Sequence, residues 1–558
     1  MLLDLRHMDA EQRLQSEICI VGGGTAGLVI AMELEAAGLA CVVLESGGLD
    51  VEEASRDLNR GSSAGEIDYQ FGDGCRSRFL GGSSNCWGGF CRAFEPSDFE
   101  RRAWVAHSGW PIGYAEFQPY VQRAHQWLKL GPVNYDPAHW VSAIGRSDVQ
   151  RFPLQGTGLM DAISHFSPPV RFGRDYRHRL CNSKLITVVL HANVVRFDSN
   201  PEGDVLQSVL ARSLNGRALS VAAERFVLAA GGIENPRLML ACSPQRPEGL
   251  ANRNGLVGRY FMDHPRVQVG RLHMQGSWKR SKLYDIKFNY HHRHVSAAGT
   301  KVAAQIMPTP EVREQLGLTN SVMWLCSVFP GEGTPQADAL FRAKQRSLGH
   351  RAWDESVLQD IRTVMAAPLT SLRFVGGRVV PRLSPAPYLD LACVAEPVPN
   401  PDSRVTLGEQ RDALGIPRAQ VEWRMGEQEK HTIDTGHRLF ADFLQARGVG
   451  RAELPPPLSG QPWPASLERQ GTWHHMGTTR MHSNPRQGVV DVNCRAHDCK
   501  NLYLAGSSVF PTVGANYPTV NLVALAVRLS DHLVQSSRRI GGSIPQSEDA
   551  MERRAVSS

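Results

Sequence analysis

The sequence predicts an α/β protein in which a dinucleotide-binding fold is assembled from segments that lie far apart in the chain. The first observation is the segment that starts at Glu17, where an apolar run, a glycine-rich turn, a helical pattern and a second apolar run follow one another. The second is that the segments starting at Arg225 and Asn501 also read as a strand, a turn and a helix. The chain has 558 residues, which is enough for two or three lobes.

The first segment reads EICIVGGGTAGLVIAMELEAAGLACVVLESGG. ICIV predicts a buried parallel strand, residues 25–37 a helix, and CVVL a second strand that ends in Glu45. Gly22 permits the tight turn, Gly24 lets the backbone approach a pyrophosphate, and Gly27 lets the helix pack closely on the strand. The helix N-terminus attracts phosphate, and the carboxylate can accept hydrogen bonds from ribose hydroxyls.

A glycine-rich turn in another kind of α/β protein is the competing interpretation of this motif. The strand, helix, second strand and terminal acid all occur in order, and this context favours dinucleotide binding. The segment alone does not distinguish FAD from NAD.

A second glycine-rich loop follows from Arg76, in the run RSRFLGGSSNCWGGFCRAFEPSDFE. Such a loop can press its backbone against a flat ligand, but a structural Ω-loop reads the same way. ANVVRF, from Ala192, predicts an edge strand. RFVLAAGGIENPRLML predicts a strand, a Gly-Gly turn and a helix that begins near Pro236, and NLYLAGSSVFPTVGANYPTVNLVALAVRLSDHL predicts a strand, a polar loop and a long helix.

Composition and charge exclude several classes of protein. Hydrophobic residues make up 42% and charged residues 21%, as in ordinary globular proteins, and a formal net charge of +6 without a nucleic-acid motif argues against nucleic-acid binding. The eleven scattered cysteines indicate reduced thiols in a cytoplasmic protein, and no zinc-type spacing predicts a metal site. We find no secretory signal and no apolar run of about eighteen residues, so membrane association is not expected.

Together these motifs resemble the glucose–methanol–choline (GMC) oxidoreductase family. The specific matches are RFLGGSSNCWGG, AAGGIENPRLML, HHMGTTRM and NLYLAGSSVFPT, supported by FMDHP from Phe261 and PNPDSRVTLG from Pro399. SGWPIGYAEFQPYVQRA, from Ser108, resembles the bacterial branch that acts on sugars and glycosides and is related to pyranose oxidase. The motifs run from Ile18 to Leu533, which is nearly the whole chain.

The resemblance implies FAD as cofactor, and a Rossmann-like FAD-binding domain interleaved with a substrate-binding domain built on a large antiparallel sheet. It divides the chain into residues 15–105 as the first part of the FAD-binding domain, 106–185 as a substrate-domain or flavin-lid segment, 186–265 as the second FAD-binding part, 266–465 as the substrate-binding domain, 466–535 as the C-terminal FAD-binding part, and 536–558 as a flexible tail.

The resemblance also assigns cofactor-binding positions along the ADP fingerprint, the second glycine loop, the adenine-contacting strand and the C-terminal segment near the ribityl chain and pyrimidine. These positions are Gly22, Gly24, Thr25, Ala26, Gly27, Glu45, Arg78, Gly82, Ser83, Asn85, Cys86, Trp87, Val194, Ala230, Gly506 and Thr519.

Two adjacent histidines occupy the family's catalytic H-x-x-G-T motif. His474 has its first position and is the expected base, whereas His475, together with Trp473, is expected in the pocket wall. Asn516 matches the partner of the base, although Tyr517 separates it from the following proline, and Asn521 is a remote alternative.

This pair of residue types suits alcohol oxidation. A neutral imidazole can take the hydroxyl proton while a hydride leaves for the flavin, and an amide can orient the same oxygen. The alkoxide-like charge then lies between imidazolium and amide. A satisfied structural pair of histidines is the competing interpretation.

Two positions depart from the family pattern. Cys86 stands where pyranose oxidase carries the histidine that is joined covalently to flavin, so a thioether is conceivable, but a small residue packed under the ring is favoured. Gly506 stands where the wider family often has aspartate, so contacts to the ribityl chain would come from the backbone or from Ser507.

The stretch from Leu340 to Arg382 is basic. It reads either as an amphipathic surface for a membrane or acidic partner, or as a solvated helix face in the substrate domain, and the second interpretation is favoured. We also consider that it forms a lid over the substrate.

The expected function is therefore FAD-dependent oxidation of a hydroxyl group of a sugar, glycoside or polyol. The alternatives are the same chemistry on an apolar or sterol-like alcohol, and non-oxidative flavin chemistry of the lyase or decarboxylase type. The expected partners are a small alcohol substrate and an electron acceptor, which is oxygen, a quinone or a carrier protein.

Overall fold

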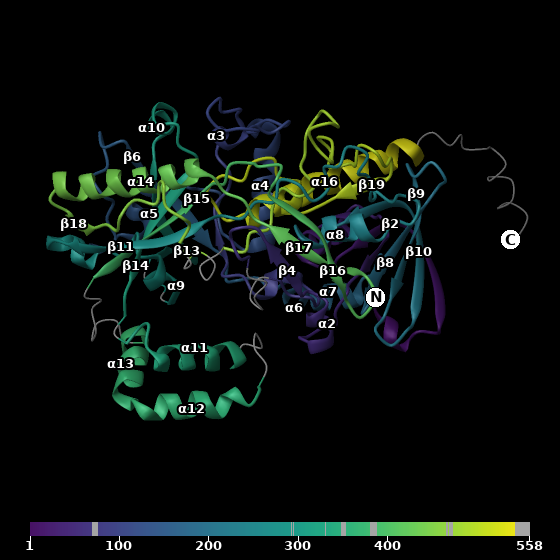
Figure 1. Ribbon diagram of the computed structural model, residues 1–558, viewed down its shortest axis with the longest axis horizontal. Coiled ribbons are helices and arrows are strands. Elements are labelled where there is room, and N and C mark those ends of the chain that lie inside the picture. The colour runs from purple at the N-terminus through teal and green to yellow at the C-terminus, as the bar shows by residue number, and fades with distance from the viewer. Residues whose placement is uncertain are drawn as a thin grey trace, which may run out of the picture.

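Two large sheets lie at opposite ends of the long axis of the molecule in the computed structural model (Figure 1). The structure describes residues 1–69, 76–291, 293, 295–329, 331–347, 353–379, 388–464, 467 and 472–541. No helix among these residues is both long and apolar enough to cross a membrane.

The first sheet, here called the parallel sheet, is the dinucleotide-binding fold that the sequence predicts. Its strands, in spatial order, are β1 (Leu2–Asp4), β7 (Ile186–Leu190), β3 (Cys41–Leu44), β2 (Glu11–Val21), β10 (Ala218–Leu228), β9 (Leu206–Arg212) and β8 (Asn193–Ser199), and β19 (Leu502–Leu504) also pairs with β10. All neighbours are parallel except the β10–β9 and β9–β8 pairs. The sheet therefore draws on strands separated by up to about 500 positions in the chain, and β8 lies at its edge as predicted.

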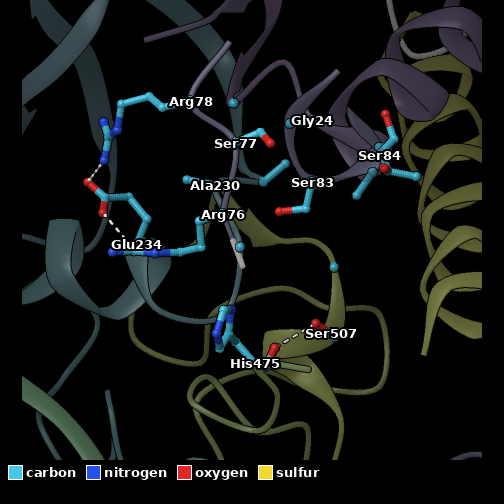
Figure 2. Close-up of a pocket in the computed structure, with 18 of the residues that line it drawn as sticks. Gly24, Arg76, Ser77, Arg78, Ser83, Ser84, Ala230, Glu234, His475 and Ser507 are labelled. Carbon is cyan, nitrogen blue, oxygen red and sulfur yellow. Dashed lines mark hydrogen bonds and ion pairs between the residues drawn. The ribbon is translucent and has the colours of Figure 1, made fainter. Parts of the chain in front are cut away.

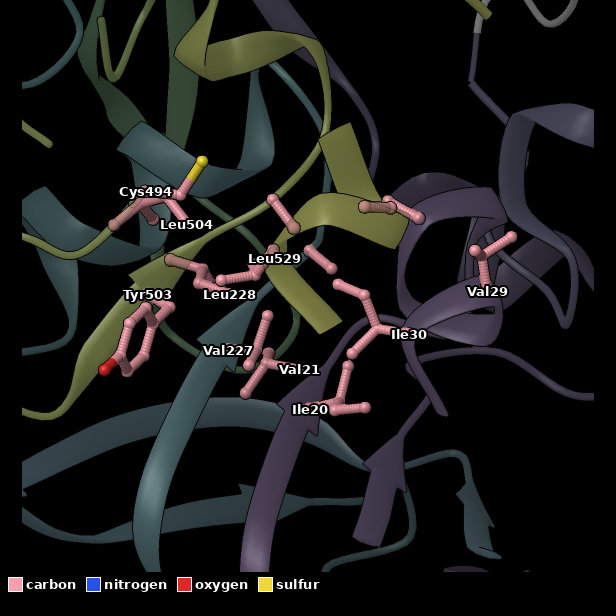
Figure 3. Close-up of a cluster of buried hydrophobic side chains, with 14 of the residues drawn as sticks. Ile20, Val21, Val29, Ile30, Val227, Leu228, Cys494, Tyr503, Leu504 and Leu529 are labelled. Atoms are coloured by element: carbon pink, nitrogen blue, oxygen red, sulfur yellow. The ribbon is translucent and has the colours of Figure 1, made fainter. Parts of the chain in front are cut away.

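A continuous apolar core fastens these distant segments together (Figure 3). Helix α1 (Thr25–Ala36) packs on β2 and β3, helix α16 (Thr519–Gly541) packs beside α1, and helix α4 (Tyr114–Leu128) lies against α16. The core side chains of β2 contact those of α1 and β10. Ile20 of β2 and Ile30 of α1, for example, are both fully buried. Burial on both sides explains why the predicted strands ICIV and CVVL read as continuous apolar runs.

Three boundaries differ from the sequence prediction. β2 begins at Glu11, because its polar first half still pairs with β10, whose own first half extends equally far. Helix α8 (Glu234–Ala241) begins two residues before the predicted Pro236. Helix α16 continues through residues 536–541, which were predicted to belong to a flexible tail, and the rest of that tail lies outside the described residues.

The second sheet, here called the antiparallel sheet, has the architecture that the resemblance implies. Its strands, in spatial order, are β18 (Gly450–Glu453), β11 (Arg266–Met274), β15 (Leu389–Ala395), β14 (Ser321–Ser327), β13 (Thr300–Pro308), β6 (Leu159–Phe166) and β5 (Phe90–Cys91), with β12 (Ser296–Ala297) on β13. Helix α14 (Glu427–Ala446) packs on β14 and β15. Strand β5 comes from residues 15–105, so the first predicted FAD-binding part also contributes to this sheet.

Smaller elements complete the part of the fold that the structure describes. A third sheet consists of β16 (Arg404–Arg411), β17 (Pro417–Glu422) and β4 (Gly61–Ala64). The remaining α-helices are α2 (Glu53–Asp57), α3 (Pro96–Phe99), α5 (Pro137–Ile144), α6 (Phe172–Asp175), α7 (Arg177–Asn182), α9 (Ile286–His291), α10 (Pro310–Gln315), α11 (Pro335–Ser347), α12 (Ser356–Ala366) and α13 (Pro368–Val379). The short helical turns are η1 (Leu5–His7), η2 (Gly82–Asn85), η3 (Gly276–Arg280) and η5 (Ser507–Val509).

Candidate active site

A cavity of about 410 Å³ lies where the motif segments converge. Seventeen of the twenty predicted site residues line it. They are Gly22, Gly24, Thr25, Ala26, Glu45, Arg78, Gly82, Ser83, Cys86, Trp87, Val194, Ala230, Trp473, His474, His475, Gly506 and Thr519. The fold thus gathers residues from both ends of the chain around one space.

Three predicted residues do not line this cavity. A Cβ atom on Gly27 would lie 2.0 Å from the carbonyl oxygen of Gly22, so this glycine serves the close packing of helix on strand. The Asn85 side chain is buried and donates to the carbonyl of Leu80 inside its own loop, 3.0 Å away. Asn516 is buried and is not among the lining residues.

The floor of the cavity is a cradle of backbone. Gly22 has φ +112°, and a Cβ atom there would lie 2.7 Å from the carbonyl oxygen of Ala229. Gly82, in the second glycine loop, has φ +53°, and its Cβ atom would lie 2.8 Å from the Cα atom of Gly24. The two glycine loops therefore meet back to back, and a flat or extended ligand can approach their backbones closely.

Glu45 closes the first strand–helix–strand unit. Its carboxylate accepts backbone N–H bonds from Gly23 and Gly47, each at 2.9 Å, and these bonds fix its orientation at the cavity edge. Burial raises the pKa of Glu45, and the two bonds act in the opposite direction. The second lone pairs of its oxygens remain available to ribose hydroxyls, which is the predicted role.

Three arginines surround the buried carboxylate of Glu234 beside the cavity, and Figure 2 shows two of them, Arg76 and Arg78. Guanidinium nitrogens of Arg237, Arg78 and Arg76 lie 2.7, 3.0 and 3.6 Å from Glu234. Burial alone would raise the pKa of Glu234, but these charges lower it to about 2. Even with Asp412, which pairs with Arg237 at 2.5 Å, the cluster keeps a net positive charge that suits a pyrophosphate.

The thiol of Cys86 has the features of a packed side chain. It donates weakly to the carbonyl of Ser83 at 3.4 Å, and burial raises its pKa. A thioether to flavin requires an activated thiolate, so a protonated thiol supports the packed interpretation over a covalent link.

The catalytic motif is held by a second segment that contains FMDHP. Met262 and Met476 form an antiparallel bridge with reciprocal N–H to carbonyl bonds of 3.0 Å. Two residues away in this register, His264 lies opposite His474, and their Nδ1 atoms are 2.9 Å apart. Asp263 accepts the backbone N–H of His474 at 2.9 Å, so backbone and ring are both fixed.

His264 has a second fixed contact, because its Nε2 atom lies 2.8 Å from the carbonyl oxygen of Gly514. Burial lowers the pKa of His264. Burial, followed by the charges of His264 and His475, lowers the pKa of His474 well below its usual value. Both imidazoles are therefore neutral at neutral pH.

His475 faces away from its neighbour, as adjacent side chains must. Its ring stacks on Phe261 at 6.2 Å and meets Tyr69 edge-on at 5.9 Å, and its carbonyl accepts the hydroxyl of Ser507 at 2.7 Å (Figure 2). Burial lowers its pKa to about 3. Its Nε2 atom is buried and has no hydrogen-bond partner within the described chain, which leaves it available to a ligand in the cavity.

Tyr517, not Asn516, is the residue that shares the cavity wall with the base. The rings of Tyr517 and His474 pack edge to face at 5.0 Å. The alternative Asn521 is buried and binds the backbone of Phe94 and Arg92 at 2.9 and 3.2 Å, which is a structural role. The sequence analysis matched Asn516 to the family's partner position and noted that Tyr517 separates it from Pro518.

The residues present fit FAD. The glycine cradle and the buried arginine cluster suit the pyrophosphate of FAD. Glu45 suits its ribose, as the motif predicts. Gly506 and Ser507 both line the cavity. The sequence analysis expected Ser507 or the backbone to supply the contacts to the ribityl chain. Among the described residues, no cluster of histidine, cysteine and carboxylate side chains suits a metal ion.

The sequence analysis missed several lining or supporting residues. His264 and Tyr517 could have been identified from the sequence, because both lie inside motifs that match the family. Arg76 and Glu234 also lie in quoted motifs, but their ion pair joins segments about 160 positions apart, and sequence spacing does not reveal it. None of the described residues of the basic stretch from Leu340 to Arg382 lines the cavity, so the lid hypothesis gains no support.

Comparisons with known proteins indicate the family that this chain resembles. Residues 399–526 match the family model described as GMC oxidoreductase. That span includes both His474 and Tyr517.

Individual relatives share low sequence identity with this chain, although some of the matches extend over most of its length. The fructose dehydrogenase large subunit of Gluconobacter japonicus is 25% identical over 321 residues, which are 57% of this chain and only 48% of that protein. The 2-methyl-1,2-propanediol dehydrogenase of Mycolicibacterium austroafricanum is 23% identical and is matched over 96% of this chain and 98% of its own length. The structure of pyridoxine 4-oxidase from Mesorbium loti has the same fold, with a TM-score of 0.52, 17% identity, and coverage of 93% of this chain and 99% of that one.

Proposed function

We propose that the chain is a GMC oxidoreductase, an FAD-dependent enzyme that acts on CH–OH groups, and that it oxidises a hydroxyl group of a sugar, glycoside or polyol to a carbonyl. The observation that carries the proposal is the hydrogen-bonded pair of His264 and His474 at the cavity wall. A proton acceptor with a fixed orientation beside the cofactor cavity is what alcohol oxidation requires.

FAD supplies the hydride acceptor when it is bound. We expect the glycine cradle around Gly22 and Gly24 to hold its pyrophosphate with the help of the buried arginine cluster, and Glu45 to hold its ribose. These residues line the cavity, and we expect the backbone at Val194 to contact the adenine, and Gly506, Ser507 and Thr519 to contact the ribityl chain and the pyrimidine.

His264 determines which nitrogen of His474 can act as a base. A carbonyl oxygen only accepts hydrogen bonds, so His264 must donate its Nε2–H to Gly514. Because His264 is neutral, its Nδ1 atom is then an acceptor, and the Nδ1 atom of His474 must carry the donated proton. The Nε2 atom of His474 is left with a free lone pair, which is the form that removes a hydroxyl proton.

Asp263 adds a second constraint to this arrangement. It binds the backbone N–H of His474 and the hydroxyl of Thr472, while Tyr69 donates to its other oxygen at 2.7 Å. The imidazole therefore keeps its position as it gains charge during proton abstraction, and little reorganisation is needed in the transition state.

Tyr517 is our candidate for the second polar group at the substrate oxygen, the role that the sequence analysis gave to Asn516. Burial raises the pKa of Tyr517, so its phenol stays protonated and can donate to an oxygen that develops negative charge. Asn516 is buried but does not line the cavity, and its Oδ1 atom has no hydrogen-bond partner within the described residues.

The substrate class is inferred from the kind of wall around this pair. Trp473, Tyr290 and Tyr517 offer aromatic surface, and the unpaired Nε2 atom of His475 offers a polar contact. Aromatic faces combined with a few fixed polar groups suit a sugar ring better than a sterol, which would require a uniformly apolar wall. Both dehydrogenases to which the chain is similar are named for polyhydroxy substrates.

The test is an anaerobic absorbance titration of the FAD-loaded protein with free sugars, glycosides, small diols and apolar alcohols in turn. We expect a sugar, glycoside or diol to bleach the flavin band, and His474→Ala to abolish the bleaching without loss of bound flavin. Bleaching by apolar alcohols alone would replace the proposed substrate class, and a flavin that no alcohol reduces would favour non-oxidative chemistry.

A further inference from the structure

Three helices form an arm that projects from the antiparallel sheet. They are α11, α12 and α13, and they occupy the connection between β14 and β15, which are adjacent antiparallel strands. Figure 1 shows α12 as the outermost element of this arm, away from both sheets. A short hairpin would suffice to join two such strands, so the arm is an addition whose role the sheet does not explain.

The inner side of the arm is well packed. Arg342 and Arg346 each contact the carboxylate of Asp360 at 2.6 Å, which fastens α11 to α12, and Phe374 of α13 is buried against them. Two basic side chains of this stretch are therefore engaged within the arm and do not form the solvated face that the sequence analysis favoured.

The outer side of the arm is apolar and exposed. Leu358, Ile361 and Met365 recur at helical spacing on α12, and Leu369 and Leu372 are exposed on the adjoining helix α13. The exposed fractions of these side chains lie between 54% and 74%. Most of the strongly exposed large apolar side chains of the described chain lie in this arm. A patch of this kind on an otherwise ordinary surface marks an interaction site.

The charged side chains near the exposed apolar residues indicate which kind of partner this surface binds. Arg362 and Arg373 are exposed beside the apolar side chains, and neither has an ion-pair partner within the described residues. The sequence contains no aspartate or glutamate from position 361 to 389. A symmetric contact between two copies of this surface would bring arginines toward arginines, which disfavours self-association.

We propose that the outer face of α12 and α13 docks on an anionic lipid bilayer. The helices are too short to cross a membrane and would lie in its interface, with leucine, isoleucine and methionine side chains among the acyl chains and arginines at the phosphates. Trp353, which precedes α12 and is 70% exposed, is a suitable anchor at the boundary between headgroups and acyl chains. Docking would be independent of the reaction at the cavity.

The test is vesicle flotation of the full-length, FAD-loaded protein. The vesicles contain phosphatidylcholine alone or phosphatidylcholine with phosphatidylglycerol. We expect co-flotation with the anionic vesicles, weakened by salt, and a partition coefficient lowered at least about tenfold in the variant Leu358→Gln, Met365→Gln, Leu369→Gln, Leu372→Gln. The pair Arg362→Gln, Arg373→Gln should remove the preference for phosphatidylglycerol.

The matched control is Leu214→Gln, Leu316→Gln, which replaces exposed leucines outside the arm and should float like the parent protein. Flavin absorbance and thermal melting show that each variant is folded, and flavin reduction by substrate should be unchanged in all of them. Absence of flotation with the anionic vesicles, or flotation that the arm variant retains, would overturn the proposal. A dimer in light scattering that the arm variant converts to monomer, without vesicle binding, would assign the surface to a second copy of the chain.

Discussion

The floor and the wall of the cavity are built in opposite ways. The floor depends on missing side chains, because Gly22 and Gly82 bring two backbones into contact and leave Gly24 open to a ligand. The wall depends on side chains that must be present in pairs, and its central pair, His264 and His474, joins segments 210 positions apart. A change in the floor is thus expected to remove the cofactor, whereas a change in the wall is expected to slow the reaction on a bound cofactor.

The largest expected effect comes from adding a side chain at Gly27, which does not line the cavity but packs helix α1 against the floor residue Gly22. Gly27→Val would place Cβ 2.0 Å from the carbonyl of Gly22, and no flexible side chain can yield there. We expect a protein that neither retains FAD nor reaches the parent melting temperature, measured by flavin absorbance and thermal denaturation.

Gly24→Ala is the matched control for that variant. Its Cβ would meet only the Cα atom of Gly82, at 3.9 Å, so the fold should melt normally in the absence of flavin while the affinity for FAD falls. Equal melting temperatures of the two flavin-free variants would show that Gly27 is not a packing position.

In the wall, the largest effect should come from the base itself. His474→Ala should retain FAD but lower the rate of flavin reduction by about 10²–10⁴-fold, the usual contribution of a general base. The measurement is anaerobic stopped-flow reduction of the bound flavin. His475→Ala is the comparison, since its ring faces Phe261 and Tyr69, and it should raise KM more than it lowers the reduction rate.

A smaller effect is expected from the residue that orients the base. His264→Ala removes the acceptor for the Nδ1–H of His474, and we expect about a 10²-fold slower reduction with substrate affinity little changed. His264→Asn places an amide oxygen near the lost Nδ1 atom and should recover much of the rate. If the two variants are equally slow, the histidine serves folding and not the tautomer of its partner.

The smallest expected change in reduction rate comes from Tyr517, and it distinguishes the role of this residue from that of its neighbour Asn516. Tyr517→Phe removes one hydrogen bond of roughly 1 kcal/mol to the substrate oxygen and should slow reduction about fivefold to tenfold. Asn516→Ala should leave the reduction rate nearly unchanged, because Asn516 does not line the cavity. The reverse pattern in stopped-flow reduction would return the partner role to Asn516.

The same contrast between floor and wall explains what the sequence could predict. Glycine motifs are local, because strand, turn and helix are contiguous, so β2, α1 and β3 and six of the sixteen expected cofactor positions followed from residues 17–48. The wall depends on the Met262–Met476 bridge, which sets the register that brings His264 to His474. No local pattern encodes that register, so His264 was quoted in a motif without receiving a role.

The exchange of Asn516 for Tyr517 has a similar origin. The motif identified the loop correctly, but which of two adjacent side chains faces the cavity depends on how the loop rests on the protein beneath it. Glu396 is part of that support, because it accepts the backbone N–H of Gly514 at 3.1 Å while it is paired with Arg102 at 2.6 Å. The extra length of β2 was also missed, since its polar half is a strand only through its pairing with β10.

The most direct test of the proposed base is the pH dependence of anaerobic flavin reduction in the parent protein, with His474→Ala as reference. Burial, and then the charges of His264 and His475, lower the pKa of His474. The neutral form that accepts the proton therefore persists as the pH falls below 6.5, and is lost only when the pH reaches the lowered pKa. We predict a reduction rate that stays constant through pH 6.5 and declines only at lower pH, with no such decline in His474→Ala. A decline centred at or above pH 6.5, or one that survives the substitution, would contradict the assignment of His474 as the base.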